Sequence, residues 1–593
     1  MQPIPTPAIA WQITGNHWLA LPCIHPADGA LHAVGIVSRG ARAAVEIAGS
    51  EHFLNGEGAA LFRPVLGVAG VRQELAREGL AWERALNWLP TFTCTLDDLV
   101  IRGTIFAPYG RDADIAGAVY AISIENRASS DVSISLSLEG TLGHRQTRVR
   151  TPRTAPDQHR VTVDGDVVLL EGATPQGAVA LAIVSDGEAR IEAGVAGENS
   201  FALHRQAAVP AGGRVSLAFY IAAGPERDGA RATAAVMRRR GWSDLLSQTR
   251  QALQALEQTV GHEGIDRLLN RNLLFAYFYG AARALDDAHF YLVRTRAPWH
   301  SAGVTTRDWE ALWWTIPAIQ LADAPLAREL LLRACELHGY APGRGVHYLD
   351  GTLFEPGFSL EGASSYAIAA DRYIRETGDD QVVEEPALAD ALYNSADDIG
   401  ARRDQNVPLY ATEVTATGAA SVLPFTLHGN AVVALALDVL RRTLDEETAR
   451  SVQDPEPVRA ALRRHFTIER SGKSTFLAAI DLGGNSAAET SDLALAYWLP
   501  LYGTVERHDS AYRRTVRGVS REPKMLAEQC ARLIGPEGSD VLRWLRRAPL
   551  YSGIAAEFVD AEGRATANGG DAALAGLLAW SVWYAVHALG VQP

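Results

Sequence analysis

Residues 132–138 form the stretch VSISLSL, which decides the fold of the first part of the chain. Its apolar side chains stand at the even positions and its serines at the odd ones, the period of a strand with one buried face. Further short apolar runs lie at 118–124, 161–163, 167–170, 179–184 and 215–221. Turn residues such as Asp164-Gly165 separate these runs, and no long helical pattern interrupts them. Residues 1–225 are therefore predicted to form an antiparallel β-sandwich.

The chain changes from a strand pattern to a helical one near residue 225. Residues 226–262 have helical periodicity and few breakers, which predicts a helical linker. Beyond it, helices are predicted at 264–285, 308–322, 325–339, 361–377, 387–403, 424–443, 455–465, 489–502, 510–518, 523–535, 538–548 and 571–590. Short connections alternate with long ones at 285–307, 340–360, 403–423, 466–488 and 549–570. This alternation favours a closed ring of helical hairpins with its long loops at one end, where binding and catalysis usually occur.

The composition is that of a globular protein with more than one domain: 593 residues, 47% apolar and 21% charged. A formal charge of −14 argues against a nucleic-acid partner, because binding phosphates requires a basic face. The four cysteines are far apart and lack C-x-x-C spacing, so neither a metal site nor a disulfide framework is predicted. Residues 1–18 lack a signal-peptide pattern, which together with reduced thiols favours the cytoplasm.

An apolar stretch near the C-terminus raises the question of a membrane anchor. Residues 572–590 (AALAGLLAWSVWYAVHALG) contain no Asp, Glu, Lys or Arg and are long enough to span a bilayer. Flanking Lys and Arg anchors are missing. We therefore predict a helix packed on all sides inside a helical domain, with no membrane partner.

The strongest local signal for function is TTRDWEALWW at 305–314. Aromatic side chains stack on sugar rings and charged groups bind sugar hydroxyls, while two carboxyl groups can supply the acid and the base of glycoside cleavage. Asp308 also stands at the predicted start of a helix, where the positive end of the helix dipole favours a negative charge. The alternative interpretation is a helix cap followed by an aromatic core face, and the spacing alone leaves both open.

A longer version of this segment, TTRDWEALWWTIPAI at 305–319, resembles the W-x-R-D segment at the second barrel helix of glucoamylases and glycogen-debranching glucosidases. Thr305 stands where that family has its tryptophan. Other segments resemble the same superfamily in order: 124–140 a strand pair of its N-terminal sandwich, 358–379 its fourth barrel helix, 423–440 its sixth, and 557–560 with 579–581 its closing segment. The resemblance implies a six-hairpin (α/α)6 barrel over residues 263–593, preceded by the β-sandwich.

The resemblance also implies roles for single residues. Arg307 and Asp308 match the pair that holds the terminal sugar, with Trp309 beside them. Glu413 lies in the loop that carries the general acid, and Glu557 lies in the loop that carries the general base. The sequence departs from the family at both places: no tryptophan precedes Glu413, no carboxylate follows it, and neither glutamine nor tyrosine flanks Glu557. The identity of the acid is therefore open.

Glu361 is the rival for the general acid, because trehalase-like and glucosidase-I-like relatives place an acidic residue in the segment 359–364. Asp350 and Glu355 are weaker rivals from the same region, and Glu355 is also a candidate for binding the sugar. Tyr366, in the segment that resembles the fourth barrel helix, is a further binding candidate.

Other polar and aromatic residues of the long loops rank below these. Trp299 and His300 precede the Arg-Asp pair and are expected to form a wall of the sugar pocket. Glu489 and Asp492 are interpreted as charges that complement the start of a helix. His428 has no metal-ligand spacing and is interpreted as an ordinary hydrogen-bonding residue.

These features together predict an exo-acting, inverting glycoside hydrolase for a small carbohydrate substrate, such as an α-glucoside. Inversion requires roughly 6.5–9.5 Å between the two carboxyl groups, so that a water molecule fits between base and sugar. Three alternatives stay open: a glycoside phosphorylase of the same superfamily, a non-catalytic carbohydrate-binding relative and, ranked last, a lyase. No metal and no cofactor is expected, and the sequence leaves both a monomer and a homodimer open.

Overall fold

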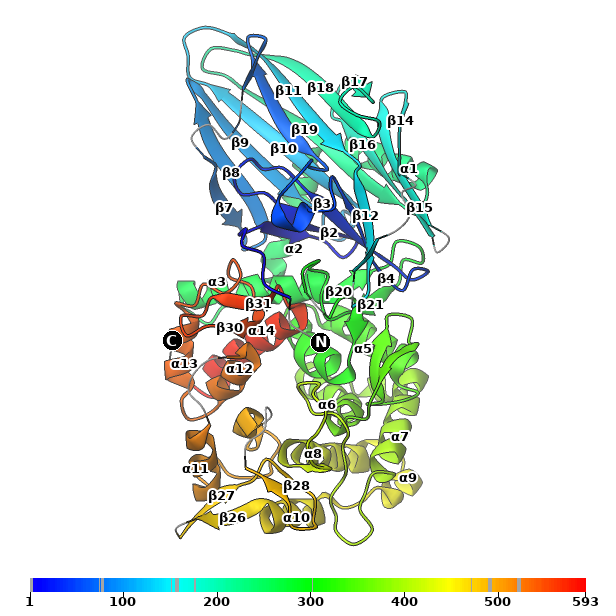
Figure 1. Cartoon of the computed structure of the whole chain (residues 1–593), viewed down its shortest axis with the longest axis vertical. Helices are drawn as coiled ribbons and strands as arrows, with labels where there is room; N and C mark the ends of the chain where they lie inside the picture. The colour runs from blue at the N-terminus through cyan, green and yellow to red at the C-terminus, as the bar shows by residue number, and fades with distance from the viewer. Residues whose placement is uncertain are drawn as a thin grey trace. The chain divides into compact units, whose positions relative to one another are not determined.

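The computed structural model describes residues 4–592 except 74, 76–78, 151, 155–158, 175–176, 301, 471, 489–492 and 520–523. The chain forms two compact units, whose elements are labelled in Figure 1. The first unit comprises Met1–Glu257, Ala281–His289 and Thr295–Val304. The second comprises Gln258–Gly280, Phe290–Arg294 and Thr305–Pro593.

The first unit is built from three antiparallel sheets. One has the order β1 (Gln12–Gly15), β2 (Leu19–Ile24), β3 (Ala33–Ser38), β4 (Ala43–Ala48), β12 (His144–Arg148) and β13 (Pro152–Thr154). The next has the order β14 (His159–Asp164), β15 (Val167–Thr174), β16 (Gly177–Ser185), β19 (Arg214–Gly224), β10 (Gly117–Asn126), β9 (Leu99–Phe106), β8 (Leu89–Leu96) and β7 (Ala81–Ala85). The last has the order β17 (Arg190–Ala193), β18 (Ser200–Val209), β11 (Val132–Thr141), β5 (Arg63–Val68) and β6 (Val71–Gln73).

The alternating stretch 132–138 lies at the start of β11, the central strand of the last sheet, between β18 and β5. Ile134, Leu136 and Leu138 are buried in the apolar core of this unit, as their even positions predict. An antiparallel β-rich region at the N-terminus is therefore confirmed. The segment predicted as a linker is helical, as α1 (Arg227–Arg240) and α2 (Trp242–Leu256), and α1 packs on β19 and β16. A short 3₁₀ helix, η1 (Phe53–Asn55), and strand β20 (Ala281–Arg283) complete the unit.

The second unit is mostly helical (Figure 1). Its helices are α3 (Glu263–Phe275), η2 (Ala276–Gly280), η3 (Glu310–Thr315), α4 (Ile316–Ala322), α5 (Ala324–His338), α6 (Leu360–Thr377), η4 (Asp380–Glu384), α7 (Pro386–Gly400), α8 (Leu427–Thr443), α9 (Glu446–Ser451), α10 (Pro455–Phe466), η5 (Leu493–Trp498), α11 (Ser510–Gly518), α12 (Leu526–Ile534), α13 (Gly538–Leu545) and α14 (Ala572–His587). Of these, η2 and η3 are π-helical turns, a local widening that often marks functional sites.

Short strands lie in the loops between these helices. They are β21 (Phe290–Leu292), β22 (Thr305–Thr306), β23 (Gly345–Tyr348), β24 (Leu353–Pro356), β25 (Phe425–Thr426), β26 (Thr467–Arg470), β27 (Lys473–Phe476), β28 (Ala479–Ile480), β29 (Ser486–Ala487), β30 (Ala556–Val559) and β31 (Ala565–Gly569). The last two pair as an antiparallel hairpin immediately before α14. The long loops of the second unit are therefore ordered by their own strand pairs.

Contacts between helices join segments far apart in sequence. Helix α6 packs against α5, α7 and α8, and α14 packs against α12, α4 and α3. The contact of α14 with α3 brings the first and last helices of the unit together. Helix α14 is buried along most of its length, as predicted, and no described helix is long and apolar enough to cross a membrane.

Most predicted helices occur within a few residues of their expected bounds, with one clear departure. The helix predicted at 489–502 is the short 3₁₀ helix η5 (Leu493–Trp498), because the chain turns at Leu499 and Pro500. Glu489 and Asp492, interpreted as charges at the start of that helix, lie outside the described residues. Helix α9 was not expected, since it has only six residues and no buried side chain.

Candidate functional site

Asp308 is held in a buried position at the start of η3. Its Oδ1 accepts a hydrogen bond of 2.9 Å from the hydroxyl of Tyr366, and its Oδ2 accepts one of 2.7 Å from the backbone N–H of Gly343. Burial raises the pKa of the Asp308 carboxyl, against the lowering effects of His347, Gly343 and Tyr366. The structure thus joins two predicted binding residues, Asp308 and Tyr366, through a direct hydrogen bond.

The next residue, Trp309, connects this position to a second buried carboxylate. Its ring stacks on Trp313, with centroids 4.9 Å apart, and meets the ring of His428 edge-on at 5.7 Å. His428 Nδ1 lies 2.9 Å from Glu361 Oε1, and its Nε2 lies 3.0 Å from the hydroxyl of Tyr502. The predicted rival acid, Glu361, therefore belongs to a buried Glu–His–Tyr chain.

Helix capping explains why these side chains are found together. Ser359 caps α6 by accepting a hydrogen bond from the N–H of Gly362, which places Glu361 in the first turn. Thr426 caps α8 in the same way and places His428 in its first turn. The Ser359 hydroxyl also donates to Glu361 Oε2 at 3.0 Å. Contact between α6 and α8 then brings the two amino ends together.

Glu310 belongs to a cluster of buried charged side chains around Arg294. The guanidinium of Arg294 forms ion pairs with Glu310 and Asp571, and its Nε lies 3.0 Å from each oxygen of Asp571. Burial lowers the pKa of Arg294, but the charges of Asp571, Glu310 and Glu557 outweigh it and raise the pKa well above the ordinary value. Asp571 also caps α14 through the N–H of Leu574. This arrangement places negative charge at the amino end of α14, where the helix dipole favours it.

Glu557, the predicted general base, lies on β30 beside this charge cluster. Its side chain is partly buried, and the amide of Asn568 on β31 donates a hydrogen bond of 2.6 Å to its Oε2. A carboxylate oxygen of Glu557 lies within 4.8 Å of one of Asp571, the partner of Arg294. Three consecutive residues therefore reach three parts of the site. Asp308 binds Tyr366, Trp309 contacts His428 beside Glu361, and Glu310 binds Arg294 beside Glu557.

Glu413, the predicted general acid, occupies a different environment. Its side chain is 55% exposed, forms a 2.8 Å ion pair with Arg402 and accepts a hydrogen bond from the N–H of Phe358. The Phe358 N–H and the Arg402 guanidinium lower the pKa of Glu413. Both effects favour the ionised carboxylate, whereas a general acid must hold a proton. The hydrogen bond to Phe358 still places Glu413 next to the residues that directly precede α6, whose first turn contains Glu361.

Arg307 lies next to the same loop as Glu413. A Cβ atom added to Gly418 would meet its Nη1 at 1.5 Å, so the guanidinium packs directly on the Cα of this glycine. Gly418 has a φ of +82°, which glycine adopts without strain. Among the described residues, the Arg307 side chain has no hydrogen-bond or ion-pair partner. Its donors are therefore available to a ligand.

The remaining predicted site residues, Glu355, Trp299 and His300, lie on other segments of the chain. Glu355 is exposed on β24. Trp299 and His300 are buried, and their segment, Thr295–Val304, belongs to the first unit. Within the described part of the second unit taken alone, no three His, Cys, Asp or Glu side chains are spaced to hold a metal ion.

Sequence reasoning missed Arg294 and Glu310, interpreted Asp571 only as part of a turn before a helix at the floor of the pocket, and assigned His428 no role in the site. Their signals in the sequence are weak. Asp571 directly precedes a long apolar helix, and His428 follows a Thr cap by two positions, but either pattern is common in structural positions.

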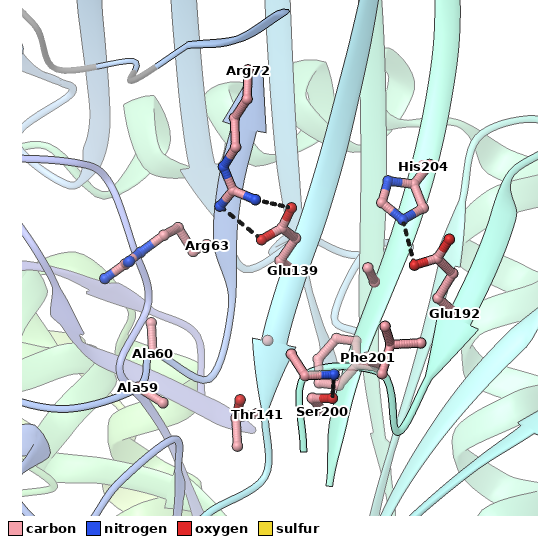
Figure 2. Close-up of a pocket in the computed structure, with 14 residues that line it drawn as sticks. Ala59, Ala60, Arg63, Arg72, Glu139, Thr141, Glu192, Ser200, Phe201 and His204 are labelled. Atoms are coloured by element: carbon pink, nitrogen blue, oxygen red, sulfur yellow. Dashed lines mark hydrogen bonds and ion pairs between the residues drawn. The ribbon is translucent and has the colours of Figure 1, made fainter. Parts of the chain in front are cut away.

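The first unit has a hollow of its own, with a volume of 310 Å³, over strands β11, β17 and β18 (Figure 2). Figure 2 shows its charged groups turned toward one another: Arg72 binds Glu139 through two hydrogen bonds of 3.1 and 3.0 Å, and His204 lies 3.6 Å from Glu192. These groups already have protein partners, so this hollow offers less to a ligand than the network of the second unit.

Comparison with known proteins finds similarity in structure only. No protein-family model matches the sequence, and no curated protein matches it in sequence. The fold matches a bacterial glucoamylase in complex with acarbose, with a TM-score of 0.64 and 10% identity over 98% of this chain and 94% of that one. It also matches a putative kojibiose phosphorylase from the human microbiome, with a TM-score of 0.53 and 9% identity over 98% and 90%. The resemblance to glucoamylases that the motifs indicate is thus confirmed at the level of the fold.

Proposed function

We propose that this chain is a glycoside hydrolase whose second unit is an (α/α)6 barrel with its active site at the amino ends of η3, α6, α8 and α14. The observation that carries the proposal is the set of contacts made by residues 308–310. These consecutive residues touch a buried carboxylate network within a fold shared with a glucoamylase. Proteins of one fold can catalyse different reactions, so hydrolysis is inferred from the residues of the site and not from the fold alone.

The general base in this proposal is Glu557. It is only partly buried, it lies on an ordered hairpin, and Asn568 holds its side chain at one oxygen. A base that activates water acts as a carboxylate, and a carboxylate oxygen of Glu557 lies within 4.8 Å of one of Asp571, beside the ion pairs of Arg294.

For the general acid, the structure shifts our preference from Glu413 to Glu361. Glu413 is exposed and held ionised by Arg402, whereas Glu361 is fully buried against His428 and Ser359. A buried carboxyl group held by neighbouring side chains is oriented for proton transfer to a leaving oxygen, whereas Glu413 is already bound to Arg402. Because Glu361 has no exposed surface, the loops over the amino end of α6 must open for the sugar to reach it.

The substrate-binding groups in this proposal are Arg307, Asp308 and Glu413. Arg307 offers donors with no protein partner, and the Asp308 carboxylate is fixed by two hydrogen bonds. Donors and acceptors of this kind bind sugar hydroxyls through strong charge-assisted hydrogen bonds. An exo-acting enzyme that removes one terminal sugar fits this compact set, and an α-glucoside is the first substrate to try.

The deciding experiment compares Glu557→Gln, Glu361→Gln and Glu413→Gln on aryl glycosides and disaccharides, with the anomeric configuration of the product followed by NMR. General acid–base groups contribute about 10²–10⁴-fold in rate, so we expect losses of that size in kcat for Glu557→Gln and Glu361→Gln. Glu413→Gln should mainly raise KM. Glu447→Gln, an exposed glutamate on α9, is the control. Hydrolysis that survives both Glu557→Gln and Glu361→Gln would show that this machinery is misassigned.

A glycoside phosphorylase is the second candidate, because the fold also matches a putative kojibiose phosphorylase. The two activities differ in whether water or phosphate receives the sugar. Release of a sugar phosphate that requires added inorganic phosphate would favour the phosphorylase, and phosphate-independent release of free sugar would favour the hydrolase.

A further inference from the structure

A second cavity of the helical unit has a basic lining that the proposed hydrolase does not use. Its volume is 460 Å³, within the range of sites that bind small molecules. It lies between the later turns of α6 and α8, the loop after η5 and the end of α14. Four arginines line it: Arg372, Arg375, Arg442 and Arg507. The other lining residues are Trp313, Ile368, Asp371, Leu435, Pro500, Leu501 and Tyr584.

This cavity is separate from the network at the amino ends of the helices. Glu361 and Arg372 are eleven positions apart on α6, which corresponds to about 16 Å along the helix axis. His428 and Arg442 are fourteen positions apart on α8, or about 21 Å. Trp313 belongs to both regions, since it stacks on Trp309 and also lines the cavity. The cavity is therefore a distinct place on the same helices.

The arginines of the cavity have too few carboxylates to neutralise them. Asp371, the carboxylate of the lining, forms ion pairs with Arg375 at 2.9 Å and with Arg442 at 2.6 Å. Neither Arg372 nor Arg507 has an ion-pair partner among the described residues. Glu376 lies close enough to attract Arg372 electrostatically but does not line the cavity. With Glu376 included, four guanidinium groups face two carboxylates among the residues that the structure describes.

Arg372 is the most unusual of these side chains, because it is only 6% exposed. Its guanidinium carbon lies 4.3 Å from the ring centroid of Trp313 and 4.7 Å from that of Trp580. Its Nη1 is buried and has no hydrogen-bond partner in the described part of the chain. Burial lowers the pKa of Arg372 to about 10, which agrees with a cation short of counter-charge. A buried cation of this kind is costly unless an anion pairs with it.

We propose that this cavity binds a phosphate group, either free or carried by a small metabolite. Guanidinium groups match the oxygens of phosphate with paired hydrogen bonds, and the two unneutralised positive charges match a dianion. The volume leaves room for more than the anion itself, so a phosphate ester also fits. The proposal does not depend on hydrolase activity, because it uses neither Glu361 nor Glu557.

The test is calorimetric titration of the full chain, at low ionic strength, with inorganic phosphate, glucose 6-phosphate and glucose. Arg507→Gln and Arg442→Gln are the test variants, because both side chains are exposed enough to be replaced without loss of folding. Arg517→Gln, an exposed arginine of α11 outside the cavity, is the matched control. Glu557→Gln should abolish hydrolysis and leave phosphate binding intact, which separates failure of this proposal from failure of the hydrolase proposal.

We expect each phosphate compound that binds to lose at least tenfold in affinity in Arg507→Gln and Arg442→Gln, and to keep its affinity in Arg517→Gln. Added salt should weaken binding, because partly exposed charges carry it. Tighter binding of glucose 6-phosphate would identify the ligand as a phosphate ester, and equal binding would identify free phosphate. The proposal is overturned if neither phosphate compound binds, if glucose binds equally well, or if the cavity variants bind like the control.

Discussion

Replacing Arg294 by leucine tests the buried charge cluster of the second unit. The Arg294 side chain is 9% exposed, and its partners Asp571 and Glu310 are 0% and 7% exposed. The substitution removes the guanidinium group to which both buried carboxylates bind, so each of them loses this ion pair. It leaves the Asp571 cap on the N–H of Leu574 in place, so α14 keeps its N-terminal hydrogen bond.

The expected cost follows from this geometry. Removal of one partner from a buried ion pair typically costs about 3–5 kcal/mol, because the remaining charge is left without compensation. Here one substitution removes the ion pairs of two buried carboxylates, so we expect the loss of stability in Arg294→Leu to fall within that range. The exposed pair of Arg450 and Glu446 on α9 provides the contrast, since such an i, i+4 surface pair contributes about 0.5 kcal/mol or less.

The cost should also depend on pH in a defined direction. In Arg294→Leu, protonation of the two former partners of Arg294 at low pH removes the buried negative charge that destabilises the folded state. The variant therefore loses less stability near pH 4 than near pH 7, and the difference from the native chain grows as pH rises.

Urea unfolding at both pH values measures the loss, and hydrogen exchange in peptides from α14 assigns it to the second unit. Two units can unfold separately, so the local measurement is needed as well as the midpoint. The reasoning is refuted if Arg294→Leu costs no more than Arg450→Leu, or if its cost shrinks as pH rises.

Three further outcomes are expected. Gly418→Ala should raise KM for the sugar substrate, because the added Cβ displaces Arg307. Gly378→Ala is the control: its φ is +75° and the space around it is open, so it should add backbone strain of about 1 kcal/mol, as at Gly418, without displacing a side chain. Equal kinetics for the two variants would contradict this. Burial raises the pKa of Asp308, so its ionisation destabilises the folded state as pH rises above about 3.9. Asp308→Asn should therefore gain stability relative to the native chain between pH 4 and 7, which urea midpoints measure. A stability difference that stays constant over this range would count against it. Leu577→Ala, at a fully buried position of α14, should lose about 2–5 kcal/mol in the same assay, and a loss below about 1 kcal/mol would mean that the helix is not packed on all sides.

The local sequence predicted those features that depend on local period. Alternation at 132–138 predicted the buried face of β11, and apolar spacing predicted most helices of the second unit close to their observed bounds. The apolar stretch after residue 571 was correctly predicted as a buried helix. Period is a property of neighbouring residues, so a single strand or helix shows it before any tertiary contact forms.

The candidate site could be predicted only in part. The segment 305–314 was identified from its own residues, but its partners Tyr366, His428 and Arg294 come from other elements, and no spacing in the sequence joins them. The preference between Glu361 and Glu413 also depended on burial, which the sequence does not show. Glu361 at the start of α6 is fully buried, whereas Glu413 in its loop is 55% exposed.

The sequence by itself therefore determined where strands and helices form, and which short segments resemble glucoamylases. Only the tertiary structure decided which carboxylates lie beside which cations, and which arginines share a cavity within an acidic chain. The physical reason is that the period of an element specifies its buried face but not the element that covers it. The charge state of a buried side chain depends on that covering element, because burial and nearby charges, more than residue type, set the cost of ionisation.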